Sequence, residues 1–411
     1  MMKKILITAI FMIILCITGC SGDAPVGNSH TKPAGSDDTS AVETKPGSED
    51  TDRSSLKLSD PVIINETIVS VLKYFVDQDN NERMLYLNGQ NQIILYDFAT
   101  EKELCAYDLE KENGDMIESR LLSYSEDEFV LFVKTAQKQD MDNSAEGMKI
   151  YSGNSDSEQY EICIFDANLN LVKTYDLTEL FPEVDGMYEY YGMCMNKDGS
   201  TLVMYGEDTI YFYSLASGKR TQTDERIMEQ LQNISIQEMA ISADEKRIAF
   251  LGCELDHDEY SVYGVMDFSS GEVKIKHTAN NYGNTLYQSQ DMVYITDGEI
   301  PHENSATGII LCINLEDGTI SDFQVDNLES TAARLTDDQK YMVTICNILS
   351  KDSNNIDGWQ MKVYDFDKNE AVWQEELTQA GRLAGFDTAK DKVLVVIYEE
   401  NSGYSIYRYN L

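Results

Sequence analysis

The chain has 411 residues, of which 72 are acidic and 32 basic, so its formal net charge is −40. This balance argues against nucleic acid as a partner and against electrostatic docking on anionic lipid. The hydrophobic fraction of 42% and the aromatic fraction of 10% suffice for a packed core, which excludes wholesale disorder. We interpret the excess of carboxylates as a solvated surface rather than a dedicated cation-binding face.

The first twenty residues have the pattern of a secretory signal. Lys3 and Lys4 are the only charged residues before Cys20, and the apolar run 5–17 follows them. A run of about thirteen residues fits a signal-peptide core but is short for a membrane span of roughly 20 residues. We therefore expect an exported protein, with a plain amino-terminal anchor helix or cleavage at another small residue as the alternatives.

The run ends in Ile17-Thr18-Gly19-Cys20, which resembles the lipobox of bacterial lipoproteins. The resemblance implies a signal peptide over 1–19, removal of that peptide, and a lipid on Cys20, including palmitate. The protein would then be held at the extracytoplasmic face of the cell membrane. Because Ser21 rather than Asp follows the cysteine, a source with two membranes would carry it on the outer membrane.

Residues 20–58 differ in composition from the rest of the chain. Ser, Thr, Gly, Asp and Pro dominate this segment, and it has hardly any aliphatic side chains. Such a composition cannot bury enough apolar surface to fold, so we predict a flexible tether between Cys20 and a folded domain at 59–411.

From residue 59 onward the sequence repeats a β-strand pattern. Seven apolar runs recur at intervals of 43 to 69 residues, at 93–98, 162–166, 210–215, 262–268, 310–315, 361–366 and 404–409. Most are followed by a tight turn in which Gly218, Gly271, Gly318 or Asn369 supplies the positive φ angle of a hairpin. A polar turn before another apolar strand, as in 196–200, completes a unit of four strands. Such units are typical of β-propeller blades.

Seven repeats predict an all-β fold, a seven-bladed β-propeller. The last unit ends after its third strand, and a spare strand at 61–65 precedes the first inner strand at 68–72. We expect this amino-terminal strand to complete the last blade and close the ring. A β-sandwich with extra hairpins is the alternative. A short helix is predicted at 223–232 with Thr223 as its cap, and a polar inserted loop at 137–158.

Several repeats end in an aromatic residue and Asp, as in Tyr96-Asp97, Phe165-Asp166 and Tyr364-Asp365. These ends are similar to the Trp-Asp of WD40 blades, and the domain resembles the WD40-like or YVTN-like propeller class. The Gly-His pair of WD40 blades is missing. The resemblance concerns architecture, and propellers carry many unrelated functions.

The residues that usually carry chemistry show no catalytic or metal-ligand spacing. After Cys20 the cysteines are far apart, which predicts buried free thiols rather than disulfides or a metal site. His257, like His30, His277 and His302, has no histidine partner, and we favour a solvated loop for it. The segment 77–82 begins like a calcium loop but lacks its later ligands, so we expect no cofactor, with calcium as the alternative. No catalytic residue is assigned, and the metal ligands are unknown.

We therefore predict a membrane-anchored, extracytoplasmic binding or scaffold module, and we favour a non-enzyme over an enzyme. Its partners would be the membrane, through the lipid on Cys20, and a protein or glycan of the cell envelope. One alternative is an extracellular propeller enzyme, a hydrolase or lyase. Another is a sensory lipoprotein that regulates a membrane protein.

Overall fold

A computed structural model describes residues 60–109, 115–125, 127–141, 150–153, 157–184, 192–206, 209–223, 225–278, 285–296, 308–325, 331–349, 356–377, 381–399 and 403–411. All of them belong to one compact unit, Ser54–Leu411. The predicted signal peptide, Cys20 and the tether lie outside the described residues. Among the helices that are described, none has the length and apolar character needed to cross a membrane.

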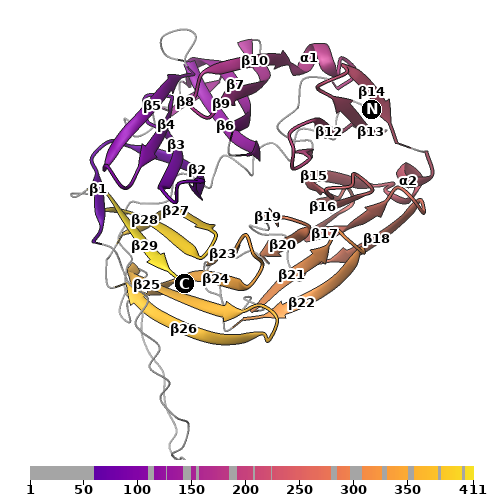
Figure 1. Ribbon diagram of the computed structural model, residues 1–411. Helices are drawn as coiled ribbons and strands as arrows, with labels where there is room; N and C mark the ends of the chain where they lie inside the picture. The colour runs from indigo at the N-terminus through magenta and orange to yellow at the C-terminus, as the bar shows by residue number, and fades with distance from the viewer. Residues whose placement is uncertain are drawn as a thin grey trace, which may run out of the picture. The chain divides into compact units, whose positions relative to one another are not determined.

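The described strands form seven antiparallel sheets, the blades of a propeller (Figure 1). Blade 1 contains β2 (Ile68–Val76), β3 (Glu82–Asn88), β4 (Gln92–Asp97) and β5 (Lys102–Asp108). Blade 2 contains β6 (Asp115–Tyr124), β7 (Glu128–Met141), β8 (Ile150–Gly153), β9 (Gln159–Asp166) and β10 (Leu171–Asp176). Blade 3 contains β11 (Met193–Met195), β12 (Thr201–Tyr205), β13 (Ile210–Ser214) and β14 (Lys219–Gln222).

The remaining four blades follow the same order from the inner to the outer strand. Blade 4 contains β15 (Ile234–Ile241), β16 (Arg247–Glu254), β17 (His257–Asp267) and β18 (Glu272–His277). Blade 5 contains β19 (Thr285–Ser289), β20 (Met292–Thr296), β21 (Ile309–Asn314) and β22 (Thr319–Gln324). Blade 6 contains β23 (Thr331–Leu335), β24 (Tyr341–Leu349), β25 (Ile356–Asp365) and β26 (Glu370–Leu377). Blade 7 contains β27 (Arg382–Ala389), β28 (Lys392–Glu399), β29 (Gly403–Asn410) and β1 (Val62–Ile64).

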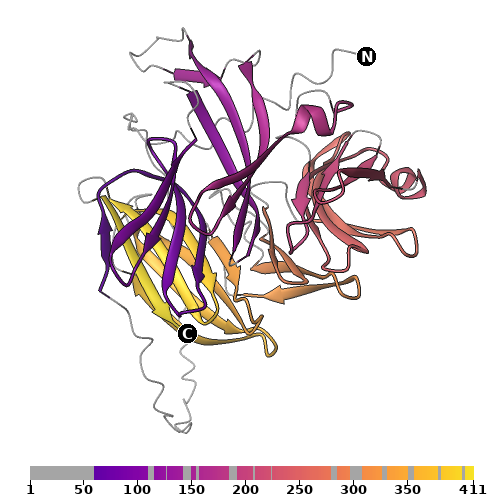
Figure 2. The same cartoon turned by 45° about the horizontal axis from the view of Figure 1, so that its top comes forward.

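Blade 7 is built from both ends of the domain. Strand β1 pairs antiparallel with β29, with Val62 opposite Ile406 and Ile64 opposite Tyr404. Figure 2 shows the yellow strands of blade 7 beside the indigo strands of blade 1. The predicted all-β seven-bladed propeller, closed by its amino-terminal strand, is therefore confirmed, and the β-sandwich alternative is wrong.

The core is divided among the interfaces between neighbouring blades. Seven hydrophobic clusters of described residues occur, and each joins two adjacent sheets. Both faces of a blade are thus buried, which explains continuous apolar runs such as 393–397 in β28, where every side chain is fully buried. Closing the ring adds the interface between blades 7 and 1 to the other six.

Turn chemistry follows the sequence prediction. Gly218, Gly271 and Gly318 have φ angles of 65°, 74° and 72°, and Asn369 has a φ of 53°. These residues occupy the left-handed region that a tight hairpin requires, where glycine and asparagine are the least strained. The predicted role of all four residues is confirmed.

Two local predictions need correction. Helix α2 spans Glu225–Gln230, and the buried Thr223 hydroxyl has no hydrogen-bond partner among the described residues, so Thr223 is not the cap. Its backbone N–H instead donates to the Ile210 carbonyl and extends blade 3. The insertion at 137–158 is in part a ribbon rather than a loop, because β8 pairs with the end of β7.

Candidate functional site

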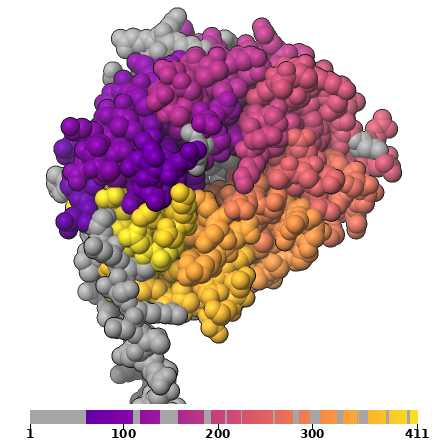
Figure 3. Space-filling view, in the orientation of Figure 1, coloured from indigo at the N-terminus to yellow at the C-terminus, as the bar shows by residue number. Residues whose placement is uncertain are grey.

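The inner strands of the seven blades surround a cavity of about 610 Å³. Figure 3 shows the hollow where the blades meet. Strands β2, β6, β11, β15, β19, β23 and β27 all contribute to its wall. A cavity of this volume matches those that hold small molecules in proteins, roughly 300–1,000 Å³. We take this channel cavity as the candidate site.

The charged residues of the channel cavity differ in balance from the rest of the chain. Four basic and three acidic side chains line it, a balance of four minus three, or +1, in a chain of 32 basic and 72 acidic residues. They are Lys73, Arg120, Lys197, Arg334, Glu238, Asp337 and Asp387. The wall of the channel cavity therefore lacks the acidic excess of the whole chain.

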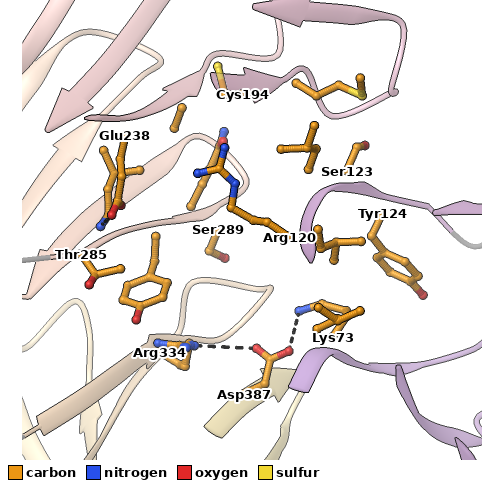
Figure 4. A pocket seen from close by; sticks show the side chains of 18 of the residues that line it. Lys73, Arg120, Ser123, Tyr124, Cys194, Glu238, Thr285, Ser289, Arg334 and Asp387 are labelled. Carbon is orange, nitrogen blue, oxygen red and sulfur yellow. Dashed lines mark hydrogen bonds and ion pairs between the residues drawn. The ribbon is translucent and has the colours of Figure 1, made fainter. Parts of the chain in front are cut away.

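Asp387 on β27 links three blades at the wall of the cavity (Figure 4). Its Oδ2 accepts a hydrogen bond from the Tyr74 backbone N–H at 2.7 Å and lies 3.4 Å from Lys73 Nζ. Its Oδ1 accepts from the Thr388 backbone N–H at 2.9 Å and lies 4.0 Å from Arg334 Nε. Both carboxylate oxygens are thus occupied, and Asp387 holds blades 1, 6 and 7 together.

Arg334 on β23 is held in place by an aromatic ring as well. Its guanidinium carbon lies 3.8 Å from the centroid of the Tyr287 ring, and its Nη1 donates to the Ala333 carbonyl at 2.8 Å. Burial works against the charged form, but Tyr287, Tyr294 and Asp387 outweigh it and raise the pKa of Arg334. The side chain is therefore a fixed cation of the wall.

Glu238 on β15 lies across the cavity from this group (Figure 4). Its Oε2 accepts a hydrogen bond from the Leu286 backbone N–H at 2.7 Å, which joins blades 4 and 5. Burial raises the pKa of Glu238, against the opposing effects of that hydrogen bond and of Arg120. Glu238 therefore takes up a proton more readily than an exposed glutamate does.

Arg120 on β6 extends into the middle of the cavity (Figure 4). Burial lowers the pKa of Arg120, while Glu238 and Cys194 raise it, and an arginine remains charged at physiological pH. Its guanidinium carbon lies 5.8 Å from the centroid of the Phe132 ring. Within the described part of the chain, Arg120 makes neither a hydrogen bond nor an ion pair, in contrast to Lys73 and Arg334.

Irregular pairing in the inner strands helps to position these side chains. Strand β2 has a register shift between Val71 and Lys73, and β15 has one between Ile236 and Glu238. A β-bulge adds one residue to one strand and changes the direction of the side chains that follow. Lys73 and Glu238 come directly after these shifts, so the bulges place both charges on the wall.

Apart from Cys194, the candidate residues singled out from the sequence lie away from the channel cavity or outside the described residues. Cys20, His30 and His302 belong to the second group. His257 and His277 are on the outer two strands of blade 4, where His277 Nε2 lies 3.2 Å from Glu254 Oε1 and both histidines pack against Tyr260. The sequence did not predict that His257 and His277 lie near each other, but in the structure both contact Tyr260.

The proposed calcium loop is a turn stabilised by its own residues. Asp77 Oδ1 accepts from the backbone N–H groups of Asp79 and Asn81, and Asp77 Oδ2 lies 2.9 Å from Arg83 Nη2. The carboxylate is therefore occupied by protein donors. No group of three or more His, Cys, Asp or Glu side chains that could hold a metal occurs in the described ranges.

The cysteines of the propeller are free thiols, as predicted. Those at 163, 194, 312 and 346 are buried, and those at 105 and 253 are partly buried. Burial raises the pKa of Cys194 to about 12, so this thiol, which lines the channel cavity, stays protonated and unreactive.

The charged wall of the channel was not predicted from the sequence, although the inner strands contain an indication of it. Arg120, Glu238, Arg334 and Asp387 are charged residues inside inner strands that also carry apolar residues. A charge at such a position points either to a surface face or to a channel. Only the ring arrangement of the blades decides between the two.

Fold and cavity together define the class of this protein: a seven-bladed β-propeller with a polar central cavity, structurally similar to WD40 propellers. No family model and no curated protein matches the sequence. Among solved structures, the β-propeller domain of Cps50 (Swd1) from Myceliophteria thermophila is similar, with a TM-score of 0.50 and 10% identity over 87% of this chain and 100% of that one. Raptor from Chaetomium thermophilum has a TM-score of 0.54 and 12% identity over 87% of this chain and 30% of that one. At such identities the likeness shows the fold alone.

Proposed function

We propose that this protein is a binding module that displays its propeller outside the cell while a lipid on Cys20 holds it at the membrane. The membrane is the cell membrane, or the outer membrane in a source that has two. The observation that carries the binding role is the polar cavity of about 610 Å³ at the centre of the propeller. The basic start, apolar run and Ile17-Thr18-Gly19-Cys20 sequence support the anchor.

The hydrogen bonds and ion pairs of the acidic residues in the cavity favour a binding role over a hydrolase or lyase reaction. A general acid or base must reach a substrate proton with an available oxygen. Asp387 uses both oxygens for backbone N–H groups and for cations, and Glu238 and Asp337 each use one oxygen to accept from a backbone N–H, of Leu286 and of Lys390. These contacts suit a role in holding blades together, so we propose recognition of an envelope protein or a glycan rather than catalysis.

The anchor is tested by metabolic labelling of the full chain with an alkyne analogue of palmitate in a bacterial host. The wild type should carry the label and sediment with membranes, whereas Cys20→Ala should lose both. Cys16→Ala is the matched control, because that cysteine lies in the apolar run and should not affect labelling. Equal labelling of wild type and Cys20→Ala would contradict the lipid anchor.

The binding role is tested by photo-cross-linking in intact cells. A photoreactive residue is placed at Ser70, which lines the channel cavity, or at Lys102, which is exposed on the outer strand β5. We expect a specific protein or glycan adduct from position 70 and none from position 102. No adduct, or the same adduct from both positions, would overturn the proposal. An adduct with a membrane kinase or peptidase would favour the sensory alternative.

A further inference from the structure

Arg120 carries a positive charge that no described residue pairs with. Its guanidinium lies in the channel cavity without a hydrogen bond or ion pair from any described residue, and the side chain is only partly exposed. A partly desolvated charge without a partner is costly for the folded state. An anion that entered the cavity and paired with Arg120 would offset that cost.

The other cations of the wall are less available. Lys73 Nζ lies near Asp387 and donates to the Thr388 carbonyl at 3.3 Å. Arg334 is held by Tyr287 and the Ala333 carbonyl. Lys197 is exposed at the rim. Arg120 is therefore the one arginine of the described cavity wall with its donors free for a ligand.

The charge balance favours a ligand with a single negative charge. Four cations and three acids leave a net charge of +1 on the cavity wall, so one anionic group is compensated. A phosphate dianion would exceed this balance by one negative charge. A planar carboxylate, in contrast, fits the fork of the guanidinium and accepts two parallel hydrogen bonds.

The rest of the wall suggests what the ligand carries besides its carboxylate. Serine, threonine, glutamine and asparagine side chains line the cavity, and several of them, such as Ser289 and Thr388, already donate to backbone carbonyls. The Ser119 hydroxyl is buried and has no hydrogen-bond partner among the described residues. Resting on the binding role proposed above, we infer that the channel cavity binds a small hydroxylated monocarboxylate, such as a uronic or aldonic acid, through Arg120.

The test is isothermal titration calorimetry with the full chain in detergent solution and four probes. D-glucuronate and D-gluconate are hydroxylated monocarboxylates, D-glucuronamide is the neutral counterpart of glucuronate, and D-glucose 6-phosphate is a dianion at pH 7.5. We expect at least one of the two monocarboxylates to bind at a ratio of one to one. We expect no heat of binding from the amide and at least tenfold weaker binding of the phosphate.

Variants locate the bound carboxylate. Arg120→Gln removes the charge and should weaken binding about tenfold to a hundredfold, as expected for the loss of a charge-assisted hydrogen bond. Arg120→Lys should weaken it less. Arg220→Gln is the matched control: Arg220 pairs with Glu183 on the outside of blade 3, and its loss should leave affinity unchanged. Circular dichroism of each variant verifies that the propeller is folded.

Three results would overturn the inference: no binding of either monocarboxylate, equal binding by Arg120→Gln, or tighter binding of the phosphate. If calorimetry shows no such binding but position 70 gives a specific cross-link, the ligand class is wrong and the binding role stands. Failure of both experiments would discard the binding role as well.

Discussion

Aspartates at the ends of third strands have a structural role that explains their recurrence. Asp97 Oδ1 accepts from the Thr100 backbone N–H at 2.8 Å, and Asp267 Oδ1 accepts from Ser269 and Ser270 at 2.9 Å. Asp267 also lies 2.7 Å from Arg247. A carboxylate that binds the N–H groups of the following turn fixes the hairpin, which is why this residue type repeats from blade to blade.

At the residue scale, Glu238→Gln should stabilise the propeller at neutral pH. Burial raises the pKa of Glu238 above its usual value of 4.5, so ionisation disfavours the folded state even with Arg120 nearby. The amide keeps an oxygen for the Leu286 N–H and carries no charge. Thermal unfolding at pH 7 should give a higher Tm for the variant.

The pH dependence of this effect has a defined sign. Between 4.5 and the raised folded pKa, the native state binds more protons than the unfolded state, so wild-type stability falls as pH rises through that window. The advantage of Glu238→Gln should therefore vanish at pH 4. Glu272→Gln, on the exposed face of β18, is the control that should leave Tm unchanged. An advantage that persisted at pH 4 would contradict the assignment.

At the scale of an element, the closing strand β1 should contribute measurably to stability. Ile64 is 7% exposed against blade 1, whereas its neighbour Ile63 is 49% exposed. Ile64→Ala should cost roughly 2–4 kcal/mol through lost burial and the cavity left behind, and Ile63→Ala should cost far less. Urea unfolding midpoints measure both. Equal effects of the two substitutions would show that β1 is not packed into the ring.

An ion network makes a second connection between blades 7 and 1. Glu82 on β3 accepts from the Tyr74 hydroxyl at 2.8 Å and from Arg408 Nη1 at 3.0 Å, and its other oxygen lies 3.1 Å from Lys392 Nζ. Burial opposes ionisation, but these donors outweigh it and lower the pKa of Glu82. Its contribution is therefore present above pH 4.5 and is lost as the pH falls through the lowered value.

Glu82→Gln should destabilise the protein by about 2 kcal/mol at pH 7, because two partly buried cations lose their partner. Glu183→Gln is the matched control, since it removes an exposed pair with Arg220 that is worth about 0–1 kcal/mol. Urea midpoints at pH 7 give the comparison. A loss for Glu82→Gln no larger than that of the control would contradict a role in ring closure.

The strands, turns and helices differ in how well their residues predict them. Third strands and several hairpin turns were predictable, because burial of both sheet faces gives continuous apolar runs and positive φ angles favour Gly or Asn. Turns that place Glu101 or Leu169 at a positive φ carry no such signal. Helix α1 (Leu177–Leu180) was missed, since a helix of one turn is defined by its Asp176 cap and by Leu177 in the core rather than by periodicity. The bulges in β2 and β15 were equally hidden, because register depends on the partner strand.

At the scale of the whole molecule, the ring creates the site that no single blade contains. Asp387 and Arg334 come from the last two blades and Lys73 comes from the first, and Arg120 and Glu238 come from two more. Gly385 contributes to the closure of this ring, because a Cβ at that position would lie 2.3 Å from Val71 Cγ2 of the neighbouring blade. The sequence repeat predicts the number of blades, and only their closure predicts which charges meet.

Hydrogen exchange of the full chain, measured by mass spectrometry with and without D-glucuronate or D-gluconate, tests most directly whether recognition takes place in the channel. We predict slower exchange in peptides from the inner strands β6, β15 and β19, which border Arg120 and Glu238, and no change in the outer strands β5 and β18. Arg120→Gln should show no such protection. Protection confined to the outer strands, or protection that survives in Arg120→Gln, would contradict the account.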